Sequence, residues 1–324
     1  MERMLITRRD VGIIALGAGV TSRLMAAKPK SNFGGVQIGA ITYSFRALPG
    51  SAEEILKYCL DCGINGIELM GNTAESYAGA PAGQRGPGGG RGSLTPEQKA
   101  AQQKATEEMK RWRLSVSMDK YKTFRKMYEG AGVKVYAFKL PPTMAMSDQE
   151  YEYVWNVGET LGASHITMEL PTEDRLLQRV ADYAAKRKLR IAFHTHGQGG
   201  SSGFEKVLAA SKYTALNFDV GHYYGVNGQS PVPLVEKYHD RIASLHLKDR
   251  KGPNSAAGNS GPRVGGPNMP WGQGETPLKE ILRLMKKRKY RFPASIEYEY
   301  NTPDGSDVLT EMKKCVEYCK KVLA

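Results

Sequence analysis

Acidic and imidazole side chains recur where strand-length apolar segments of this chain turn polar. In RIAFHTHGQGG, residues 190–200, an apolar run ends in His194 and His196, with one residue between them. Side chains two positions apart on a strand share a face, so both imidazoles are expected on one side. Two solvated loop histidines are the alternative. Four other segments end in a comparable way, and together the five carry Glu169, His194, His196, Asp219, His222, His246, Lys248, Asp249, Glu297 and Glu299.

Such a set of side chains predicts a cation site. Crowded carboxylates and imidazoles lose solvation and repel one another unless a cation balances them. Mixed oxygen and nitrogen ligands favour Mn²⁺ or Zn²⁺, with Mg²⁺, Co²⁺ and Fe²⁺ also compatible. The predicted metal ligands are Glu169, His194, Asp219, His246 and Glu297.

The segments that must position these residues alternate between strand and helix patterns. Such alternation predicts an α/β fold with a parallel sheet and outer helices, and eight units in about 290 residues match a closed (β/α)8 TIM barrel. An open doubly wound sheet is the alternative, but ITYSFRALPGS after the first segment is not a glycine-rich phosphate turn. The predicted strands cover residues 36–43, 65–70, 133–140, 164–170, 190–196, 214–220, 242–248 and 293–299.

Alternation of side chains within the segments favours closure. One set is bulky, and the other is small at first and polar at the carboxyl end, as in Ser244, His246 and Lys248. In a barrel the second set would face inward and meet at the mouth. Residues 36–43 do not show this pattern, and the spacing of Val135 and Phe138 interrupts it.

Residues 1–30 predict an export signal, and residues 31–324 a single barrel domain. Arg8 and Arg9 precede a mildly apolar stretch, and small residues near Ala27 offer a cleavage site, which resembles a twin-arginine signal peptide. The expected location is therefore periplasmic or otherwise exported. An N-terminal helix of the mature domain is the alternative.

Composition excludes other classes of protein. No apolar run reaches the roughly 18 to 20 residues of a spanning helix, so no membrane span is predicted. The net charge is +13, but the basic residues are spread over helical faces without the interleaved aromatic residues of single-strand binders, so no nucleic-acid partner is predicted. Four cysteines are expected as reduced thiols, with a bridge between the first and last helices as the alternative; they are Cys59, Cys62, Cys315 and Cys319.

Two glycine-rich segments, 78–93 and 251–274, would be loops at the mouth. Loops of this length are usually functional lids or disordered. The second is predicted to be a lid that carries Trp271, and the first to be largely disordered. Residues 111–122, RWRLSVSMDKYK, are predicted as a further insert on the mouth side.

Four motifs carry a resemblance: GINGIELM, NFDVGH, LHLKD and IEYE, in that order. Over about residues 36–320 the chain resembles the xylose isomerase-like TIM-barrel superfamily of sugar phosphate isomerases and epimerases, whose relatives include ketose 3-epimerases, inosose dehydratases and endonuclease IV. The resemblance implies a metal held by Asp219, His246 and Glu297. Ketose epimerases have a glutamate ligand on the fifth strand, where this chain has His194. The resemblance thus implies that His194 takes the ligand place, that His196 faces the substrate and that Glu169 restores the missing carboxylate.

The predicted function is that of a divalent-metal-dependent sugar isomerase or epimerase. It would abstract a proton next to a carbonyl through a metal-stabilised enediolate. Glu297 or Glu169 is the predicted base, and His196, Lys139 or Lys248 the complementary acid. The predicted substrate contacts are Tyr43, Glu68, His222, Lys248 and Trp271.

Two other functions remain open. A missing epimerase glutamate also suits a lyase or hydratase acting on a keto sugar or keto-glycoside, and a non-catalytic sugar-binding barrel would need no metal. The endonuclease activity is disfavoured because the second and third strands end in Glu68 and Lys139 rather than histidine. The expected partner is an unphosphorylated sugar or glycoside, since no phosphate cradle is visible, and a homo-oligomer stays open.

Overall fold

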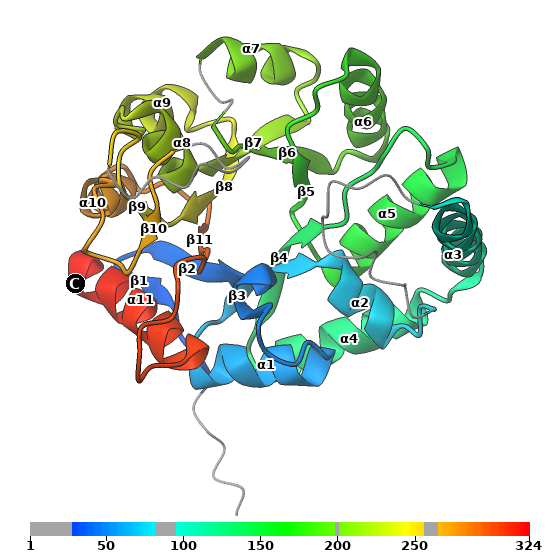
Figure 1. Ribbon diagram of the computed structural model, residues 1–324, viewed down its shortest axis with the longest axis horizontal. Helices are drawn as coiled ribbons and strands as arrows, with labels where there is room; N and C mark the ends of the chain where they lie inside the picture. The colour runs from blue at the N-terminus through cyan, green and yellow to red at the C-terminus, as the bar shows by residue number, and fades with distance from the viewer. Residues whose placement is uncertain (1–27, 82–94, 198–200, 256–264) are drawn as a thin grey trace, which may run out of the picture.

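A computed structural model describes residues 28–81, 95–197, 201–255 and 265–324 (Figure 1). Most of the predicted export signal and parts of both glycine-rich segments lie outside these residues, so the predictions for them stay untested. Within the described residues, no helix combines the length and the apolar character that a bilayer span requires.

Eight parallel strands close into a barrel, which confirms the predicted fold class. The order of strands is β2-β11-β8-β7-β6-β5-β4-β3, and pairing of β2 with β3 completes the circle. A short strand, β1 (Asn32–Phe33), adds antiparallel to β2. The barrel strands are β2 (Val36–Ile41), β3 (Gly66–Met70), β4 (Lys134–Lys139), β5 (His165–Glu169), β6 (Arg190–His194), β7 (Thr214–Asp219), β8 (Ile242–Leu247) and β11 (Ala294–Ile296).

Helices surround the strands (Figure 1). Several begin at a capping box, in which a serine or threonine and a residue three positions later exchange hydrogen bonds with the backbone; Ser51 with Glu54 and Ser147 with Glu150 are examples. The helices are η1 (Thr42–Phe45), α1 (Ala52–Asp61), α2 (Gly71–Tyr77), α3 (Pro96–Ser115), α4 (Asp119–Gly130), α5 (Asp148–Leu161), α6 (Asp174–Arg187), α7 (Ser201–Ala209), α8 (Val220–Asn227), α9 (Val232–Tyr238), α10 (Leu278–Arg288) and α11 (Val308–Leu323).

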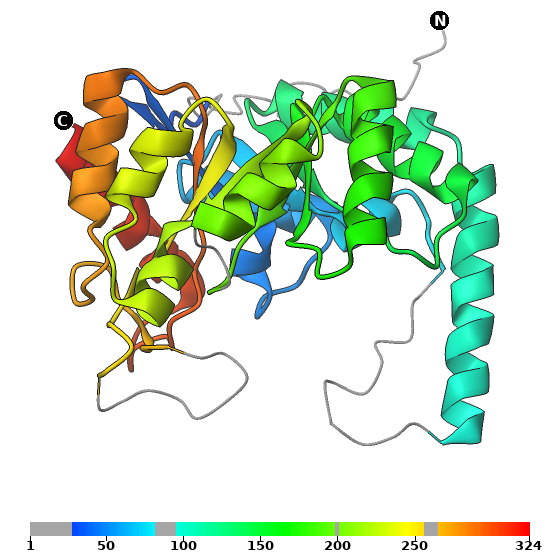
Figure 2. The same cartoon turned by 90° about the horizontal axis from the view of Figure 1, so that it is seen from above.

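Residues 111–122, predicted as a mouth-side insert, are helical and lie between β3 and β4. This segment forms the end of α3 and the start of α4. None of the residues of α3 is buried, and Figure 2 shows the helix extending past the body of the barrel. A helix with so little apolar contact needs another anchor, and Arg113 near its end provides one by an ion pair of 2.8 Å with Glu75 of α2.

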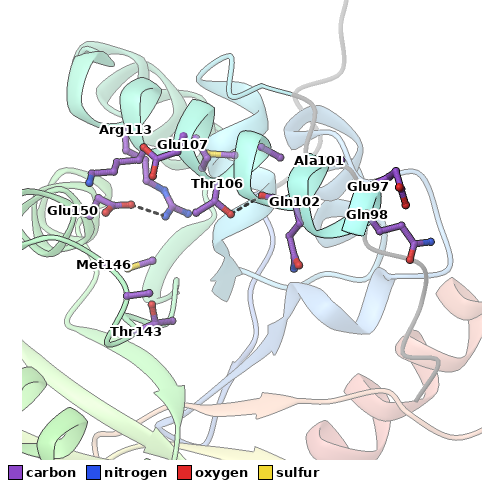
Figure 3. A pocket seen from close by; sticks show the side chains of 14 residues that line it. Glu97, Gln98, Ala101, Gln102, Thr106, Glu107, Arg113, Thr143, Met146 and Glu150 are labelled. Atoms are coloured by element: carbon purple, nitrogen blue, oxygen red, sulfur yellow. Dashed lines mark hydrogen bonds and ion pairs between the residues drawn. The ribbon is translucent and has the colours of Figure 1, made fainter. Parts of the chain in front are cut away.

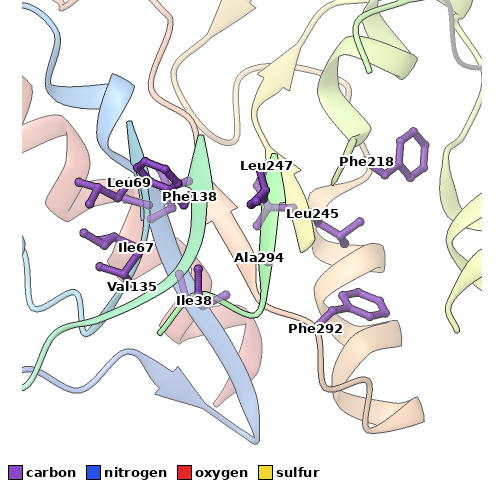
Figure 4. Packing of buried hydrophobic residues seen from close by; sticks show 14 of the residues in the cluster. Ile38, Ile67, Leu69, Val135, Phe138, Phe218, Leu245, Leu247, Phe292 and Ala294 are labelled. Carbon is purple, nitrogen blue, oxygen red and sulfur yellow. The ribbon is translucent and has the colours of Figure 1, made fainter. Parts of the chain in front are cut away.

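Bulky side chains on the outer face of the strands form the main core with the helices. Figure 4 shows such residues, among them Ile67, Leu69 and Phe138, projecting from the strands. Each of these three is fully buried. Burial of an aliphatic or aromatic side chain contributes about 1.5 to 3 kcal/mol, so this layer holds the helices on the barrel.

The inner face explains the two irregularities of the strand pattern. Between Ile67 and Glu68 the register with β4 shifts by one residue, a β-bulge that leaves Tyr136 as the extra residue. The Tyr136 hydroxyl hydrogen-bonds to Ser295 Oγ at 2.6 Å, so its ring crosses the interior. A Cβ on Gly39 would lie 2.4 Å from that hydroxyl. β2 therefore departs from the pattern because its inner position leaves room for Tyr136.

The four cysteines are buried and none forms a disulfide. Burial raises the pKa of the Cys62 thiol to about 12, and the same cause raises the pKa of the others. These thiols are part of the packing of α1 and α11.

His165 is a buried histidine at the amino end of β5, away from the carboxyl ends of the strands. Its ring nitrogens lie 2.9 Å from Ser164 Oγ and 3.0 Å from Ser244 Oγ. Burial lowers its pKa to about 4 from 6.5. The folded chain therefore takes up this proton at lower pH than the unfolded chain does.

This difference predicts a loss of stability in mild acid. The contribution of a neutral His165 is complete above pH 6.5 and falls as the pH decreases toward 4, by up to about 3 kcal/mol. We expect His165→Gln to remove this part of the pH dependence, as measured by urea unfolding from pH 8 to 4. Parallel curves for the two proteins over that range would contradict the assignment.

Candidate metal centre

Four of the five predicted ligands converge at the carboxyl end of the barrel. One ligand atom from each of His194, Asp219, His246 and Glu297 lies within 4.8 Å of the others, and all four residues are buried. Their strands explain this arrangement. Asp219 and His246 are paired in the register of β7 and β8, and the Glu297 backbone N–H donates to Leu247 O at 3.0 Å, which extends β11 alongside β8.

His246 lies between two carboxylates. Nδ1 is 2.7 Å from Glu297 Oε2, and Nε2 is 2.7 Å from Glu68 Oε2. Burial alone would lower the pKa of His246, but the two carboxylates raise it to about 10. The ring therefore donates through both nitrogens in this arrangement, and to bind a metal through Nδ1 it would release that proton while Nε2–H stays on Glu68.

Glu68 supports this ring from below. It is fully buried, and it accepts hydrogen bonds from Thr167 Oγ1 at 2.7 Å and from Asn217 Nδ2 at 3.0 Å. Burial would raise its pKa, but His246 lowers it to about 2. The structure thus places Glu68, a predicted substrate contact, beneath the centre with its carboxylate bound by His246, Thr167 and Asn217.

Lys248 supplies a positive charge to the same group. Its Nζ lies 3.1 Å from Asp219 Oδ2, 3.1 Å from Glu297 Oε2 and 2.7 Å from Glu299 Oε2. The side chain is 2% exposed. Burial lowers its pKa, but these carboxylates outweigh burial and raise it. Lys248 and His246 therefore balance part of the negative charge that the sequence analysis assigned to a divalent ion alone.

Two atoms of the group nevertheless lack hydrogen bonds within the described residues. They are His194 Nδ1 and Asp219 Oδ2, both buried, although Lys248 Nζ is close to the latter. Buried polar atoms without a partner are rare. Burial lowers the pKa of His194 well below its usual value, so its ring is neutral and carries a lone pair. Two imidazoles and two carboxylates around such atoms fit a divalent cation of the Mn²⁺ or Zn²⁺ kind.

A second set of three imidazoles lies beside the first. Ligand atoms of His194, His196 and His222 also lie within 4.8 Å of one another. However, this set contains no carboxylate to balance a divalent charge, and the Lys248 ammonium, which borders both sets, lies 2.9 Å from His222 Nε2. Because the set also shares His194, we assign the metal to the group that contains the carboxylates.

Glu169, the fifth predicted ligand, lies outside the four-residue group. Its carboxylate forms an ion pair of 2.9 Å with Lys139 Nζ and lies 3.4 Å from His196 Nδ1, and its side chain is 47% exposed. The Lys139 ammonium on the neighbouring strand holds it at the rim. The predicted acid and base residues Lys139, Glu169 and His196 thus form a row on one side of the mouth.

The two predicted aromatic contacts, Tyr43 and Trp271, lie outside the group of four converging residues. Tyr43 packs under Arg46, whose guanidinium carbon is 4.5 Å from the ring centroid, and lines a cavity of about 460 Å³ that Lys139 also lines. Trp271 packs edge-on against Tyr318 of α11, in a cavity whose lining includes none of the four converging residues.

The loop that carries Trp271 is held by its own contacts. A short antiparallel pair, β9 (Asp249–Arg250) with β10 (Asn268–Met269), closes it. Asp249 accepts hydrogen bonds from the backbone N–H groups of Gly272 and Gly274. These bonds direct the loop toward α11, which explains why Trp271 does not reach the centre.

A further cavity of about 640 Å³ lies between α3 and the segment before α5 (Figure 3). Arg113 and Glu150 face each other there, 3.5 Å apart. Its described lining contains none of the converging residues, so we do not assign the chemistry to it.

Comparison with known proteins agrees with this architecture. Residues 173–321 match the family model described as xylose isomerase-like TIM barrel. The chain has the xylose isomerase-like TIM barrel fold. The match includes four strands of this xylose isomerase-like barrel, β6, β7, β8 and β11, that position the converging residues.

Among curated proteins, this xylose isomerase-like barrel is similar to inosose dehydratases from Clostridium botulinum. The one from strain Eklund 17B is 29% identical over 157 residues, which are 45% of this chain and 52% of the relative. The one from strain Alaska E43 is 28% identical over the same shares. The match thus spans about half the length of these relatives.

Solved structures share the fold at low identity. The probable 3-DHS dehydratase AsbF from Bacillus anthracis, involved in petrobactin synthesis, has a TM-score of 0.58 at 15% identity, with 87% of this chain and 99% of that chain covered. A sugar phosphate isomerase/epimerase from Parabacteroides distasonis has a TM-score of 0.56 at 16% identity, with 87% and 95% covered. At such identities the likeness concerns the fold alone.

The position of Glu68 predicts an effect on metal affinity. Carboxylates that orient a ligating histidine typically contribute 10- to 100-fold to binding, so we expect Glu68→Gln to weaken Zn²⁺ binding about 10-fold in calorimetric titration. Glu75→Gln, in a buried ion pair on α2, is the matched control and should change stability alone. Equal affinity in Glu68→Gln and the native protein would show that Glu68 does not orient His246.

Proposed function

We propose that this chain is a divalent-metal-dependent enzyme that abstracts a proton next to the carbonyl of a sugar, as sugar isomerases and epimerases do. The observation that carries the proposal is the convergence of His194, Asp219, His246 and Glu297, with two buried atoms that lack hydrogen bonds. Active sites of TIM barrels lie at this end of the strands.

These four residues would hold the ion, and Glu68 would orient His246 from below. The ion would supply Lewis acidity toward a carbonyl oxygen and an adjacent hydroxyl, which stabilises the negative charge of the enediolate. Lys248 keeps Asp219 and Glu297 in place, since its ammonium group contacts both carboxylates.

We assign proton transfer to Lys139, Glu169 and His196, which lie together at the rim of the mouth. Glu297 is a weak base, because Lys248 and His246 outweigh burial and lower its pKa well below the usual value. Glu169 is more exposed and touches both Lys139 and His196. We therefore assign Glu169 as the base, with Lys139 and His196 as the groups that return a proton.

A dehydratase is the second candidate. Both curated relatives are inosose dehydratases, and this chain has His194 where the ketose epimerases have a glutamate. With one carboxylate base and with lysine or imidazole as the acid, the same first step can lead to loss of a hydroxyl group as water.

Export belongs to the proposal as well. The paired arginines and apolar stretch of the first 30 residues support a twin-arginine signal. An exported enzyme meets few phosphorylated sugars, so the proposed substrate is an unphosphorylated sugar or glycoside. Fractionation of cells that express the full chain would test this part, and a purely cytoplasmic location would contradict it.

The central experiment combines metal analysis with exchange in deuterated water. We expect about one Mn²⁺ or Zn²⁺ per chain, and incorporation of deuterium next to the carbonyl of a keto or aldo sugar, followed by NMR. Asp219→Asn should abolish both metal binding and exchange, while Asp240→Asn, at an exposed site, should change neither. Deuterium uptake with all hydroxyl groups retained indicates an isomerase or epimerase, and loss of water a dehydratase.

Two results would contradict the proposal. A protein that binds no divalent ion when supplied with one is not the proposed enzyme. A protein that binds the ion, and binds sugars without exchanging any proton, is a sugar-binding barrel instead.

The assignment of the base gives a separate prediction. Glu169→Gln should lower the exchange rate by about 10²- to 10⁴-fold and leave metal affinity unchanged, because Glu169 lies outside the ligand group. Glu173→Gln is the matched control, since Glu173 is exposed near the start of α6. A loss of metal from Glu169→Gln would return this residue to the ligands.

A further inference from the structure

His222 is in contact with two cationic side chains. Arg250 Nη1 lies 2.8 Å from Nδ1 of its ring, and Lys248 Nζ lies 2.9 Å from Nε2. A guanidinium or an ammonium group can only donate, and a neutral imidazole has one acceptor nitrogen. The ring can therefore accept a hydrogen bond from only one of the two cations. Its proton lies on the nitrogen that does not accept, so the tautomer shows which cation is the donor.

The surroundings of Arg250 favour its contact with His222. The side chain is 4% exposed, and its Nε and Nη2 donate to Gly266 O at 2.9 and 2.5 Å. A Cβ on Gly225 of α8 would lie 2.6 Å from Arg250 Nε, so this glycine leaves room for the guanidinium. The Arg250 group is thus fixed by backbone on two sides.

Lys248 has other partners. Its ammonium group is within 3.1 Å of three carboxylates, those of Asp219, Glu297 and Glu299, and it loses little when His222 does not accept from it. The His222 backbone N–H donates to Asp219 Oδ1 at 2.7 Å, which anchors the residue itself.

We propose that Arg250 is a positioning residue that accounts for the Nε2–H tautomer of His222, and so makes His222 a hydrogen-bond donor toward the metal centre. With Nδ1 accepting from Arg250, the proton lies on Nε2, so the 2.9 Å contact with Lys248 Nζ joins two donors and the ammonium must turn toward its carboxylates. The oxygens then nearest to Nε2 are Asp219 Oδ2 and Glu299 Oε2, both at 3.8 Å. His222 is then neither a base nor a metal ligand through Nε2. The acceptor is one of these carboxylates or an oxygen of a bound polyhydroxy compound, and the second choice rests on the proposed function.

The test uses the full chain with ¹⁵N-labelled histidine and long-range ¹H–¹⁵N correlation spectra. The chain has six histidines, and His222→Gln identifies the resonances of His222. In chelator-treated native protein we expect Nδ1 to resonate as an unprotonated nitrogen and Nε2 as a protonated one. The opposite pattern, or a doubly protonated ring, would overturn the proposal.

Variants separate positioning from packing. Arg250→Met removes the donor, and we expect the ratio of the Nε2–H to the Nδ1–H form to fall by about tenfold or more, since a hydrogen bond from a charged donor is lost and Lys248 can then donate to Nε2. Arg250→Lys keeps a cationic donor and should retain the native tautomer. Lys251→Met, on the next residue, is the control and should leave the spectrum unchanged.

Two results would refute the role of Arg250. An unchanged Nε2–H ring in Arg250→Met would show that another contact sets the tautomer. If Arg250→Met does not fold, the native spectrum still tests the tautomer, and a shift to the Nδ1–H form in Arg250→Lys would overturn the role.

Addition of one equivalent of Zn²⁺ distinguishes this inference from the second set of imidazoles. We expect the resonances of His194 and His246 to shift, and Nε2 of His222 to remain protonated. A zinc-shifted Nε2 on His222 would make it a ligand and overturn the proposal. The spectra require neither substrate nor turnover, so absence of sugar exchange would refute the proposed function alone.

Discussion

An imidazole held between two carboxylates is the interaction on which the candidate site depends. His246 reaches Glu68 on β3 and Glu297 beyond β11, both at 2.7 Å. Burying such charges is unfavourable unless each is paired and hydrogen-bonded, and Thr167 and Asn217 complete the set on Glu68. β3 and β8 are separated by two strands along the sheet, so their side chains meet because the sheet is closed. The charge pairs of the site can therefore form only when the sheet closes into a barrel.

Below this polar layer the barrel is filled by small side chains, by the His165 imidazole and by the large ring of Tyr136. Ala192, Ala215 and Ala243 form a separate buried cluster, and Tyr136 occupies the space that Gly39 leaves open. This filling keeps solvent away from the lower side of Glu68, which is fully buried. The same low polarity that makes unpaired charges unfavourable there strengthens the hydrogen bonds of the paired ones.

Much of the barrel and the centre could be predicted from the sequence, because alternation along a strand is a local property. A polar residue at the carboxyl end of a barrel strand lies at the mouth, which brings together Asp219, His246 and Glu297. The pairing of long side chains is not local. Glu169 has the same position at a strand end, but Lys139 on the next strand holds it at the rim.

The roles of Glu68 and Arg250 likewise depend on contacts between distant segments. Glu68 meets His246 across the barrel, and Arg250 reaches His222 through a loop that a two-residue strand pair closes. The direction of Trp271 depends on backbone bonds to Asp249. No periodicity in the sequence encodes these contacts. The glycine-rich composition of residues 251–274 did indicate that the alternation of strand and helix is interrupted there.

Two glycines one helical turn apart, Gly221 and Gly225 of α8, bring this helix against the segment after β8. A Cβ at the first would lie 2.3 Å from Lys248, and one at the second 2.6 Å from Arg250. The backbone of α8 is thus in direct contact with the side chains of Lys248 and Arg250. This contact fixes the position of α8 relative to the segment after β8. A ligand arriving here finds its partners already oriented, so little reorganisation energy is needed on binding, and selectivity among similar ligands rests on shape and charge rather than on adaptation.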